Sequence, residues 1–411
     1  MKMKKIVIIG IVLAAFAFVQ IAAGVFSHVN FTADDNYGGD LRLRRNEILC
    51  AHQGVNSFRI WNRDVTLPGF KPYGRPDKPN VTGKAGDRAV HAYTPMHTTL
   101  FYFYGWLSES LCFSVMSCVF GFCLFFIVCE SFRLSKERFG DTGGGLASCF
   151  ALTIISFFAA QCFLSLNYGV LLLAVLLLMN RALEKGHDVA AGLLWAVTMI
   201  KPQVGLLFVW PLLWHRHYRA IVVAAATGLA LTIVASLIVH ESVVDLILQI
   251  PQIGKPYGSG ATIDKIVKPI LGEHASFAVM MLFFGLTGLA TWLLRKSRDF
   301  VLCCVPVVLA MSLWTYGSLH DQVVKLPLFI FLGGLMFAAR KFDKWCFLGT
   351  AYCVVLLPLL AWNIAVGAKL LDPTGIGWMY RLTVHASNAL LIAFVALLIR
   401  EERRNEIGKR G

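Results

Sequence analysis

The sequence predicts an all-α protein that crosses a membrane many times, and its composition and apolar runs carry that prediction. Of its 411 residues, 57% are hydrophobic and only 15% are charged, whereas soluble domains average roughly 45–50% and about 25%. Apolar runs near the ~20 residues needed to cross the hydrocarbon core recur along the whole chain. We therefore expect a single polytopic domain over residues 1–411, with about twelve transmembrane or re-entrant helices.

The lengths of the apolar runs differ. The first, residues 6–26, is longer than the apolar region of a signal peptide, so we expect a retained helix. The other expected spans are 98–130, 146–165, 168–180, 188–200, 203–214, 219–239, 276–294, 300–316, 323–339, 346–366 and 382–400. The runs at 168–180, 188–200 and 203–214 reach only roughly 18–20 Å as helices, against a core of about 30 Å. Such short helices persist where protein buries them or where they line a wet cavity, which implies a cavity open to the outer face.

The basic residues predict the orientation. More than half of the 38 Lys and Arg residues lie in short loops on the side of the N-terminus or in the C-terminal tail, and this bias marks the cytoplasmic side. We expect both termini in the cytoplasm, with a tail at 400–411, a large first extracytoplasmic loop at 27–97 and a second at 240–275. Topology thus accounts for the net charge of +14, so the expected partner is the lipid bilayer and not a nucleic acid.

Each outer loop contains a candidate helix. Apolar Leu41 and Ile48 alternate with charged residues up to His52, a pattern that predicts an amphipathic helix lying along the membrane surface. A similar segment runs from Ser242 to Ile250. Cys50 has no second cysteine in its loop, so we expect a free thiol that a reagent unable to cross the membrane would reach.

Acidic residues that follow the first span are candidates for a general base. Asp34, Asp35 and Asp40 lie just beyond that span, where a carboxylate at the mouth of a cavity can take a proton from a hydroxyl. The alternative is that they are hydrated carboxylates that keep the loop soluble.

A lysine between two short apolar runs is the second candidate. Lys201 is followed by Pro202, which breaks the helix because it lacks an N–H, and then by Gln203. A charged residue inside an apolar stretch is costly and is by default a functional hypothesis. Lys201 could hold a phosphate; alternatively it extends to the lipid headgroups.

A histidine at the outer end of a later span is the third candidate. His320 lies in Ser318-Leu-His-Asp-Gln322 and could hydrogen-bond a phosphate or a sugar, unless it is a loop histidine that faces water. His97 and Arg381 are weaker candidates of the same kind.

Five segments, taken in order, resemble glycosyltransferase family 87, whose members are multispan enzymes of the GT-C fold. Asp40-Leu41 followed by Gly54-Val-Asn-Ser-Phe58 is similar to the family pattern after the first span, and the Asp-to-Gly spacing agrees. The other four segments are Tyr93-Thr94-Pro95, Leu166-Asn167-Tyr168-Gly169, Gly192 to Arg219 around Lys201-Pro202, and Ser318 to Pro327. The resemblance covers most of residues 30–330, with departures at Ser57-Phe58, Thr94, Asn167 and Leu319.

The resemblance implies transfer of a mannose-like hexose from a polyprenyl-phosphate donor to a hydroxyl of a glycan or glycolipid acceptor. The reaction would take place outside a bacterial cytoplasmic (inner) membrane, as an inverting displacement with Asp40 as base and Asp34 and Asp35 as alternatives. The substrate contacts it implies are Lys201, His320, Tyr93, Asn167, Gln203 and Arg381. Lysine, arginine and histidine can stabilise a leaving phosphate, so no metal and no cofactor is expected.

Other functions would use similar sequence features. A transporter or flippase of a polar or lipid-linked solute also has broken helices and charges inside the membrane. A ligase or polymerase of lipid-linked polysaccharide would be expected to carry its large loop late in the chain. A membrane scaffold without activity is a further alternative.

Overall fold

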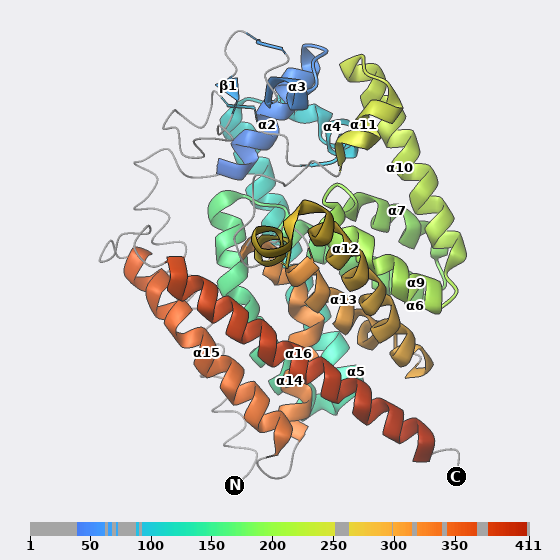
Figure 1. Cartoon of the computed structure of the whole chain (residues 1–411), viewed down its shortest axis with the longest axis vertical. Helices are drawn as coiled ribbons and strands as arrows, with labels where there is room; N and C mark the ends of the chain where they lie inside the picture. Colours follow the sequence, from blue (N-terminus) through green and yellow to red (C-terminus); the bar gives the residue numbers. More distant parts are fainter. Residues whose placement is uncertain are drawn as a thin grey trace.

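The computed structural model describes residues 39–61, 65–67, 71–72, 88–89, 93–250, 263–297, 299–314, 319–338, 343–367 and 377–408, and in these the chain is almost entirely helical (Figure 1). The elements in chain order are α2 (Gly39–His52), α3 (Ser57–Trp61), β1 (Lys71–Pro72), β2 (Arg88–Ala89), α4 (Pro95–Leu100), η2 (Tyr102–Trp106), α5 (Glu109–Ser165), α6 (Gly169–Glu184), α7 (Asp188–Thr198), α8 (Pro202–Gly205), η3 (Leu206–Phe208), α9 (Val209–Trp214), α10 (Tyr218–Val239), α11 (Val243–Gln249), α12 (Ile263–Leu294), η5 (Arg295–Ser297), α13 (Phe300–Trp314), η6 (Leu319–Lys325), α14 (Leu326–Ala338), α15 (Lys344–Gly367) and α16 (Gly377–Gly408). The two short strands pair in parallel.

The helices at one end of the molecule form a cap over the rest. Helices α2, α3, α4 and α11 gather at the top of Figure 1, and both expected loop helices are present, as α2 and α11. The prediction that the first would lie on a membrane surface is wrong, because Arg44 and Glu47 are 3% and 5% exposed and Ile48 is fully buried. Protein covers both its polar and its apolar sides.

The 57-residue helix α5 consists of two arms that meet at Gly140. This glycine has φ 70°, a left-handed conformation that a residue with a side chain adopts only at a cost. The two arms correspond to the expected spans 98–130 and 146–165. The first span was placed too early, since residues 95–106 form α4 and η2 and the helix starts at Glu109, after the capping residue Ser108.

Helix α5 packs closely against α14. A side chain added at Gly334 would meet the Phe139 ring at 2.2 Å, and one at Gly333 would meet Phe150 at 2.8 Å. The absence of a side chain at these two positions therefore leaves room for the Phe139 and Phe150 rings of α5 against α14.

The helices from α6 to α9 are short, as the sequence predicts. Helix α6 has 16 residues and α7 has 11, and Pro202 begins the four-residue α8. At 1.5 Å per residue, α7 reaches only about 17 Å. Most of α6 is buried, so this helix is a short element inside the protein, which is one of the two settings that permit short helices; α7 is buried on one side only, with Val189 and Leu193 exposed.

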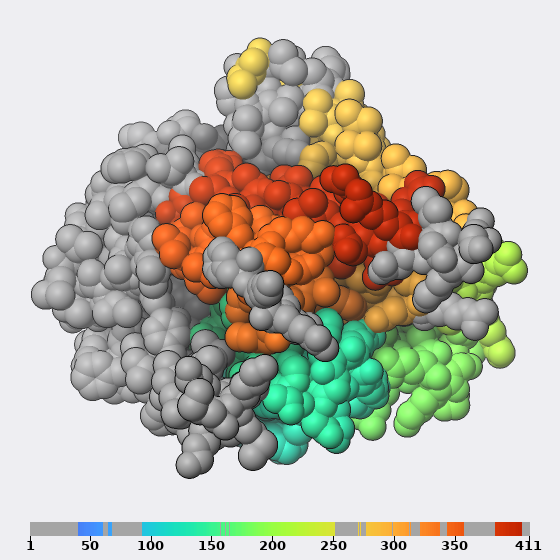
Figure 2. Space-filling model, turned by 90° about the horizontal axis from the view of Figure 1, so that it is seen from below, coloured from blue at the N-terminus to red at the C-terminus, as the bar shows by residue number. Residues whose placement is uncertain are grey.

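Four helices in the described part of the chain are long and apolar enough to cross a membrane. They contain Glu109–Ser156, Tyr218–Val239, Phe277–Ser297 and Thr383–Arg404. The last belongs to α16, which lies beside α15 across the face shown in Figure 2. The expected number of about twelve crossings stays a prediction, although an apolar helix occurs near each expected position from residue 98 onwards.

Candidate functional site

A carboxylate at the start of α2 and a carboxamide at the α5–α6 turn meet below the cap. Asp40 is in the first turn of α2 and is partly exposed. Asn167 donates from Nδ2 to its Oδ2 atom at 2.7 Å. The Oδ1 atom of Asn167 accepts from the backbone N–H of Gly169 at 3.1 Å, which fixes the direction of the amide. Asp40 therefore has an uncharged hydrogen-bond donor, the Asn167 amide, and the residue remains partly exposed to solvent.

The same carboxamide binds the cation. Lys201 donates from Nζ to Asn167 Oδ1 at 3.1 Å, so one amide joins the carboxylate of Asp40 to the ammonium of Lys201. The lysine is the residue that precedes α8, where Pro202 breaks the hairpin. The Trp195 indole donates to the Gly205 carbonyl across this break at 2.8 Å and holds the two short helices together.

The counter-ion of Lys201 comes from η6. Asp321 accepts from Lys201 Nζ at 2.5 Å, and the two side chains are 7% and 3% exposed. Extension of Lys201 to the lipid headgroups is therefore wrong for this structure. We call Asp40, Asn167, Lys201 and Asp321 the Asn167 site. With one cation and two carboxylates, its formal charge is negative.

Tyr93 lies between two cations. Its ring centroid is 5.6 Å from Lys201 Nζ and 4.7 Å from the guanidinium carbon of Arg44. Arg44 also pairs with Glu47 at 2.5 Å. Burial raises the pKa of the Tyr93 phenol to about 12 even though Lys201 and Arg44 act in the opposite direction, so the hydroxyl keeps its proton at neutral pH.

Backbone contacts connect Tyr93 to the lysine turn. The N–H of Thr94 donates to the Ile200 carbonyl at 3.1 Å, and its hydroxyl donates to the Met199 carbonyl at 3.1 Å. The segment that ends the first loop thus holds the turn before Lys201 in place.

A chain of buried polar side chains continues behind Tyr93. His97 Nε2 lies 3.1 Å from the Tyr168 hydroxyl, which donates to the Tyr104 hydroxyl at 3.1 Å. Glu47 lies 3.7 Å from His97 Nδ1. The weaker candidate His97 is therefore part of the support behind the Asn167 site.

The predicted residues fall into three groups. Asp40, Tyr93, Asn167 and Lys201 come together, and Gln203 is buried nearby in α8. His320 and Arg381 lie in η6 and α16, but their side chains are outside the described residues. Asp34 and Asp35 are outside them altogether.

Sequence reasoning missed Asp321, Arg44 and Glu47. A signal for Asp321 was available, because a buried lysine needs a counter-charge and Asp321 adjoins the chosen His320. Arg44 and Glu47 are three residues apart, a spacing that places both side chains on one face of a helix and could have indicated that they pair.

The thiol of Cys50 is not accessible. Cys50 is fully buried, and burial raises its pKa to about 12. The expectation that a reagent in water would reach it is wrong, so its protection says nothing about orientation. In the described residues, no cluster of three or more His, Cys, Asp or Glu side chains has the arrangement of a metal site.

The fold and the site define a class: a helical membrane protein in which one carboxamide joins a carboxylate to an ammonium group below a cap of helices. The profile of glycosyltransferase family 87 matches residues 91–315. The match covers more than half of the chain, which therefore belongs to glycosyltransferase family 87 and is a membrane glycosyltransferase. The matched residues include Tyr93, Asn167 and Lys201 of the Asn167 site and its surroundings. Neither the curated proteins nor the solved structures contain a match.

Proposed function

We propose that this glycosyltransferase moves a mannose-like hexose from a polyprenyl-phosphate donor to a hydroxyl acceptor, with Asp40 as the base. The arrangement around Asn167 carries the proposal: a partly exposed carboxylate lies one amide away from a buried ammonium. The acceptor hydroxyl can approach the Asp40 carboxylate while the donor phosphate approaches the Lys201 ammonium group. Membership of the family favours an enzyme over a transporter or flippase.

The reaction is a single displacement with inversion. Asp40 takes the proton of the acceptor hydroxyl as its oxygen attacks the anomeric carbon. The bond from that carbon to the phosphate oxygen breaks, and the polyprenyl phosphate leaves with the electron pair. Lys201 stabilises the charge that develops on this phosphate. The Tyr93 ring lies 5.6 Å from the Lys201 ammonium group. No step of this mechanism requires a metal ion or a cofactor.

Replacement of the base tests the mechanism. Asp40→Asn keeps the shape and a hydrogen-bonding group but cannot accept the proton, so we expect turnover to fall by roughly 10²–10⁴-fold. The assay measures transfer from a synthetic polyprenyl-phosphate mannose by purified protein. The matched control is Asp245→Asn, which changes an exposed carboxylate on α11 of the cap. Near-normal turnover of Asp40→Asn would remove this residue from the role.

The donor class needs its own experiment. The unmodified protein is offered a panel of polyprenyl-phosphate sugars and nucleotide sugars, with short glycans and glycolipids as acceptors. We expect transfer from a lipid-linked sugar alone. Use of a nucleotide sugar without any lipid-linked donor would contradict the proposal.

We also place the Asn167 site on the extracytoplasmic side of a bacterial inner membrane, in accordance with the bias of basic residues. In a cysteine-free background, Asp245→Cys and Asp141→Cys put exposed thiols on α11 and beside the Gly140 bend. An impermeant reagent should label the first in intact cells and the second only after the membrane is opened. The opposite pattern would invert the topology.

A further inference from the structure

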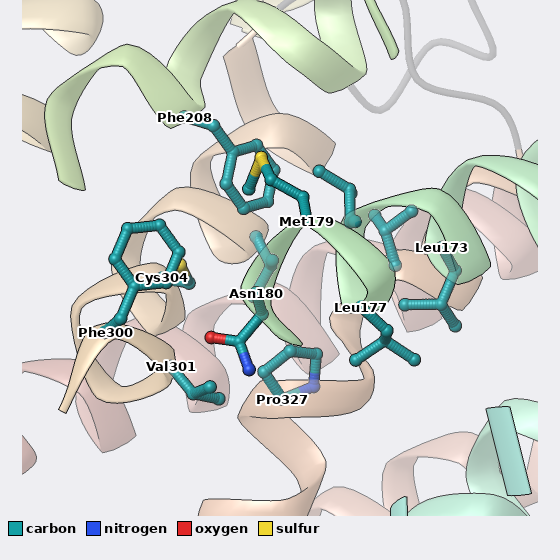
Figure 3. A pocket seen from close by; sticks show the side chains of 12 residues that line it. Leu173, Leu177, Met179, Asn180, Phe208, Phe300, Val301, Cys304 and Pro327 are labelled. Carbon is teal, nitrogen blue, oxygen red and sulfur yellow. The ribbon is translucent and has the colours of Figure 1, made fainter. Parts of the chain in front are cut away.

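Apolar surface is enclosed inside the bundle but open on the cap. The cavity shown in Figure 3, lined by Leu177, Phe300 and Pro327 among others, has a volume of about 20 Å³, and a space of this size holds about one water molecule. On the cap, by contrast, Val244 and Leu248 of α11 are 64% and 62% exposed. Apolar side chains are stabilised when lipid or protein covers them, so the open surface on α11 fits a further contact.

The exposed apolar residues of α11 form one side of the helix. Val244, Ile247 and Leu248 are three and four positions apart, a spacing that places them on one face, and all three are exposed. Leu246 and Gln249 lie on the opposite face and are buried against protein. We call Val244, Ile247 and Leu248 the α11 face. A helix with one open apolar side and one side held by protein suits a boundary between the protein and a second apolar phase.

The α11 face adjoins the end of a membrane-crossing helix. Helix α10 has 22 residues and reaches about 33 Å, enough to cross the hydrocarbon core. Its Ile233 and Leu237, near the cap, are exposed. Leu246 packs against Val239, the last residue of α10, and α11 lies beside the upper end of α10 in Figure 1. A protein that covered the α11 face would have to lie against a helix that lipid surrounds, so lipid is the favoured occupant.

A tryptophan marks the same level at a second span. Trp106 ends η2, three positions before α5 begins at Glu109, and is 72% exposed. Tryptophan at the end of a membrane-crossing helix is typical of the interface between lipid and water. Tyr102, also in η2, packs against the cluster that contains Leu246 of α11. Helices η2 and α11 therefore meet at one level, which Trp106 indicates to be the interface.

We propose that α11 is an interfacial anchor whose α11 face enters the lipid leaflet next to the cap. The partner is the lipid bilayer, and an anchor of this kind enters about 5–10 Å into the boundary between headgroups and acyl chains. Helix α11 thus takes the position that the sequence predicts for α2, which protein covers instead. The anchor does not depend on the proposed sugar transfer.

The opposite side of the anchor holds the cap. Asn56, between α2 and α3, donates from Nδ2 to Gln249 Oε1 at 2.8 Å and to Glu241 Oε2 at 2.9 Å. Its Oδ1 atom accepts from the N–H of Phe58 in α3 at 3.0 Å. The side chains of Asn56, Glu241 and Gln249 are buried, so these bonds are shielded from water. With lipid on one side and the cap on the other, α11 sets the height of the cap above the membrane.

Two fluorescent probes on α11 test the anchor. Cysteine-free full-length protein in phosphatidylcholine nanodiscs carries an environment-sensitive label at Leu248→Cys or at Asp245→Cys, an exposed position beside the α11 face. Lipids with nitroxides at two acyl depths, and iodide in the water, serve as quenchers. We expect the Leu248→Cys probe at a depth of about 5–10 Å and the Asp245→Cys probe within reach of iodide. Equal quenching of the two probes by iodide would overturn the proposal.

A charge within the α11 face should expel it from the leaflet. Val244→Glu is expected to bring the Leu248→Cys probe from that depth to the water, because a carboxylate is costly among acyl chains. The matched control Asp245→Asn should leave the depth unchanged, and an unchanged depth in Val244→Glu would contradict the anchor.

A crosslinking experiment distinguishes lipid from protein as the occupant. A benzophenone side chain replaces Leu248 in protein that keeps its natural cysteines, so the result does not depend on the folding of the cysteine-free form. After irradiation in bacterial membranes, mass spectrometry should find lipid adducts. Adducts to a second copy or to another protein, or a Leu248→Cys probe protected from both iodide and nitroxide lipids, would overturn the proposal.

Discussion

The Asn167 site and the ion-pair network of Arg133 with Glu130, Glu137 and Glu184, called the Arg133 network, are built from charged groups but differ in how deeply most of those groups are buried. At the Asn167 site the charged pair is 3% and 7% exposed. In the Arg133 network, Arg133 is 26% exposed, Glu184 33% and Glu137 50%, and only Glu130 is buried, at 2%. Water therefore screens the pairs of Arg133 with Glu184 and Glu137 and hardly reaches the pair of Lys201 with Asp321, so a contact of similar length has a very different energetic weight at the two places.

The two sites also differ in how their charges are linked. A neutral carboxamide joins the anion to the cation at the Asn167 site. In the Arg133 network, Arg133 binds Glu130, Glu137 and Glu184 directly. Guanidinium groups can exchange partners within such a network, whereas the pair of Lys201 and Asp321 at the Asn167 site is buried. The comparison teaches that the polar end under the cap is the rigid one.

The largest effect is expected from Lys201→Met. It leaves Asp321 buried without its counter-ion, so we expect a loss of about 3–5 kcal/mol in the free energy of unfolding together with loss of transfer. Adding Asp321→Leu should restore much of the stability but not the activity. Chemical unfolding in detergent and the transfer assay measure the two quantities. A loss below about 1 kcal/mol in the single variant would mean that this pair behaves like a surface pair.

An intermediate effect is expected from Asn167→Leu. The change removes the three hydrogen bonds of the amide, to Asp40, Lys201 and the Gly169 N–H, and leaves Asp40 without the Asn167 amide, at a cost of about 1–3 kcal/mol. Because Asp40 loses its orientation, turnover should fall by about 10²-fold with a small change in KM. The exposed-carboxylate variant Asp245→Asn again provides the reference. Unchanged turnover would show that the amide does not orient the base.

The smallest effect is expected from Glu137→Gln. The Arg133–Glu137 pair is 26% and 50% exposed, and Arg133 keeps its pairs with Glu130 and Glu184. We therefore expect a loss of about 1 kcal/mol or less in the free energy of unfolding, which should fall further in 1 M salt because screening weakens exposed pairs. Unfolding at low and high salt measures it. A salt-independent loss as large as that of Lys201→Met would remove the contrast between the two sites.

Periodicity and composition predicted the helices well. The positions of the apolar runs, the short helices around Lys201 and the two loop helices all follow from residue pattern, because each depends on neighbours along the chain. The membrane-surface position expected for α2 is wrong, because neighbouring protein covers this helix. A pattern that mixes apolar and charged residues cannot distinguish a membrane surface from a polar protein interior.

The site was predictable only in part. Asp40, Asn167 and Lys201 could each be chosen for its chemistry or by resemblance, but their meeting at one carboxamide depends on tertiary packing. Asn167 was placed by resemblance to a glutamine, and the bridge it forms requires the left-handed turn at Leu166, with φ 49°. The need of a buried lysine for a counter-charge points to a nearby acidic residue, but the sequence does not show that Asp321 and Lys201, 120 positions apart, meet.

The pairing of Lys201 with Asp321 has a consequence for biosynthesis. The two residues are 120 positions apart, so at about 5–20 residues per second the ribosome needs roughly 6–24 s to complete the second after the first. During that interval the nascent chain carries an ammonium group between apolar segments without its carboxylate. The Asn167 amide is already synthesised by then and can hold the lysine. The addition of η6 is thus the step that gives Lys201 its ion-pair partner in the newly made protein.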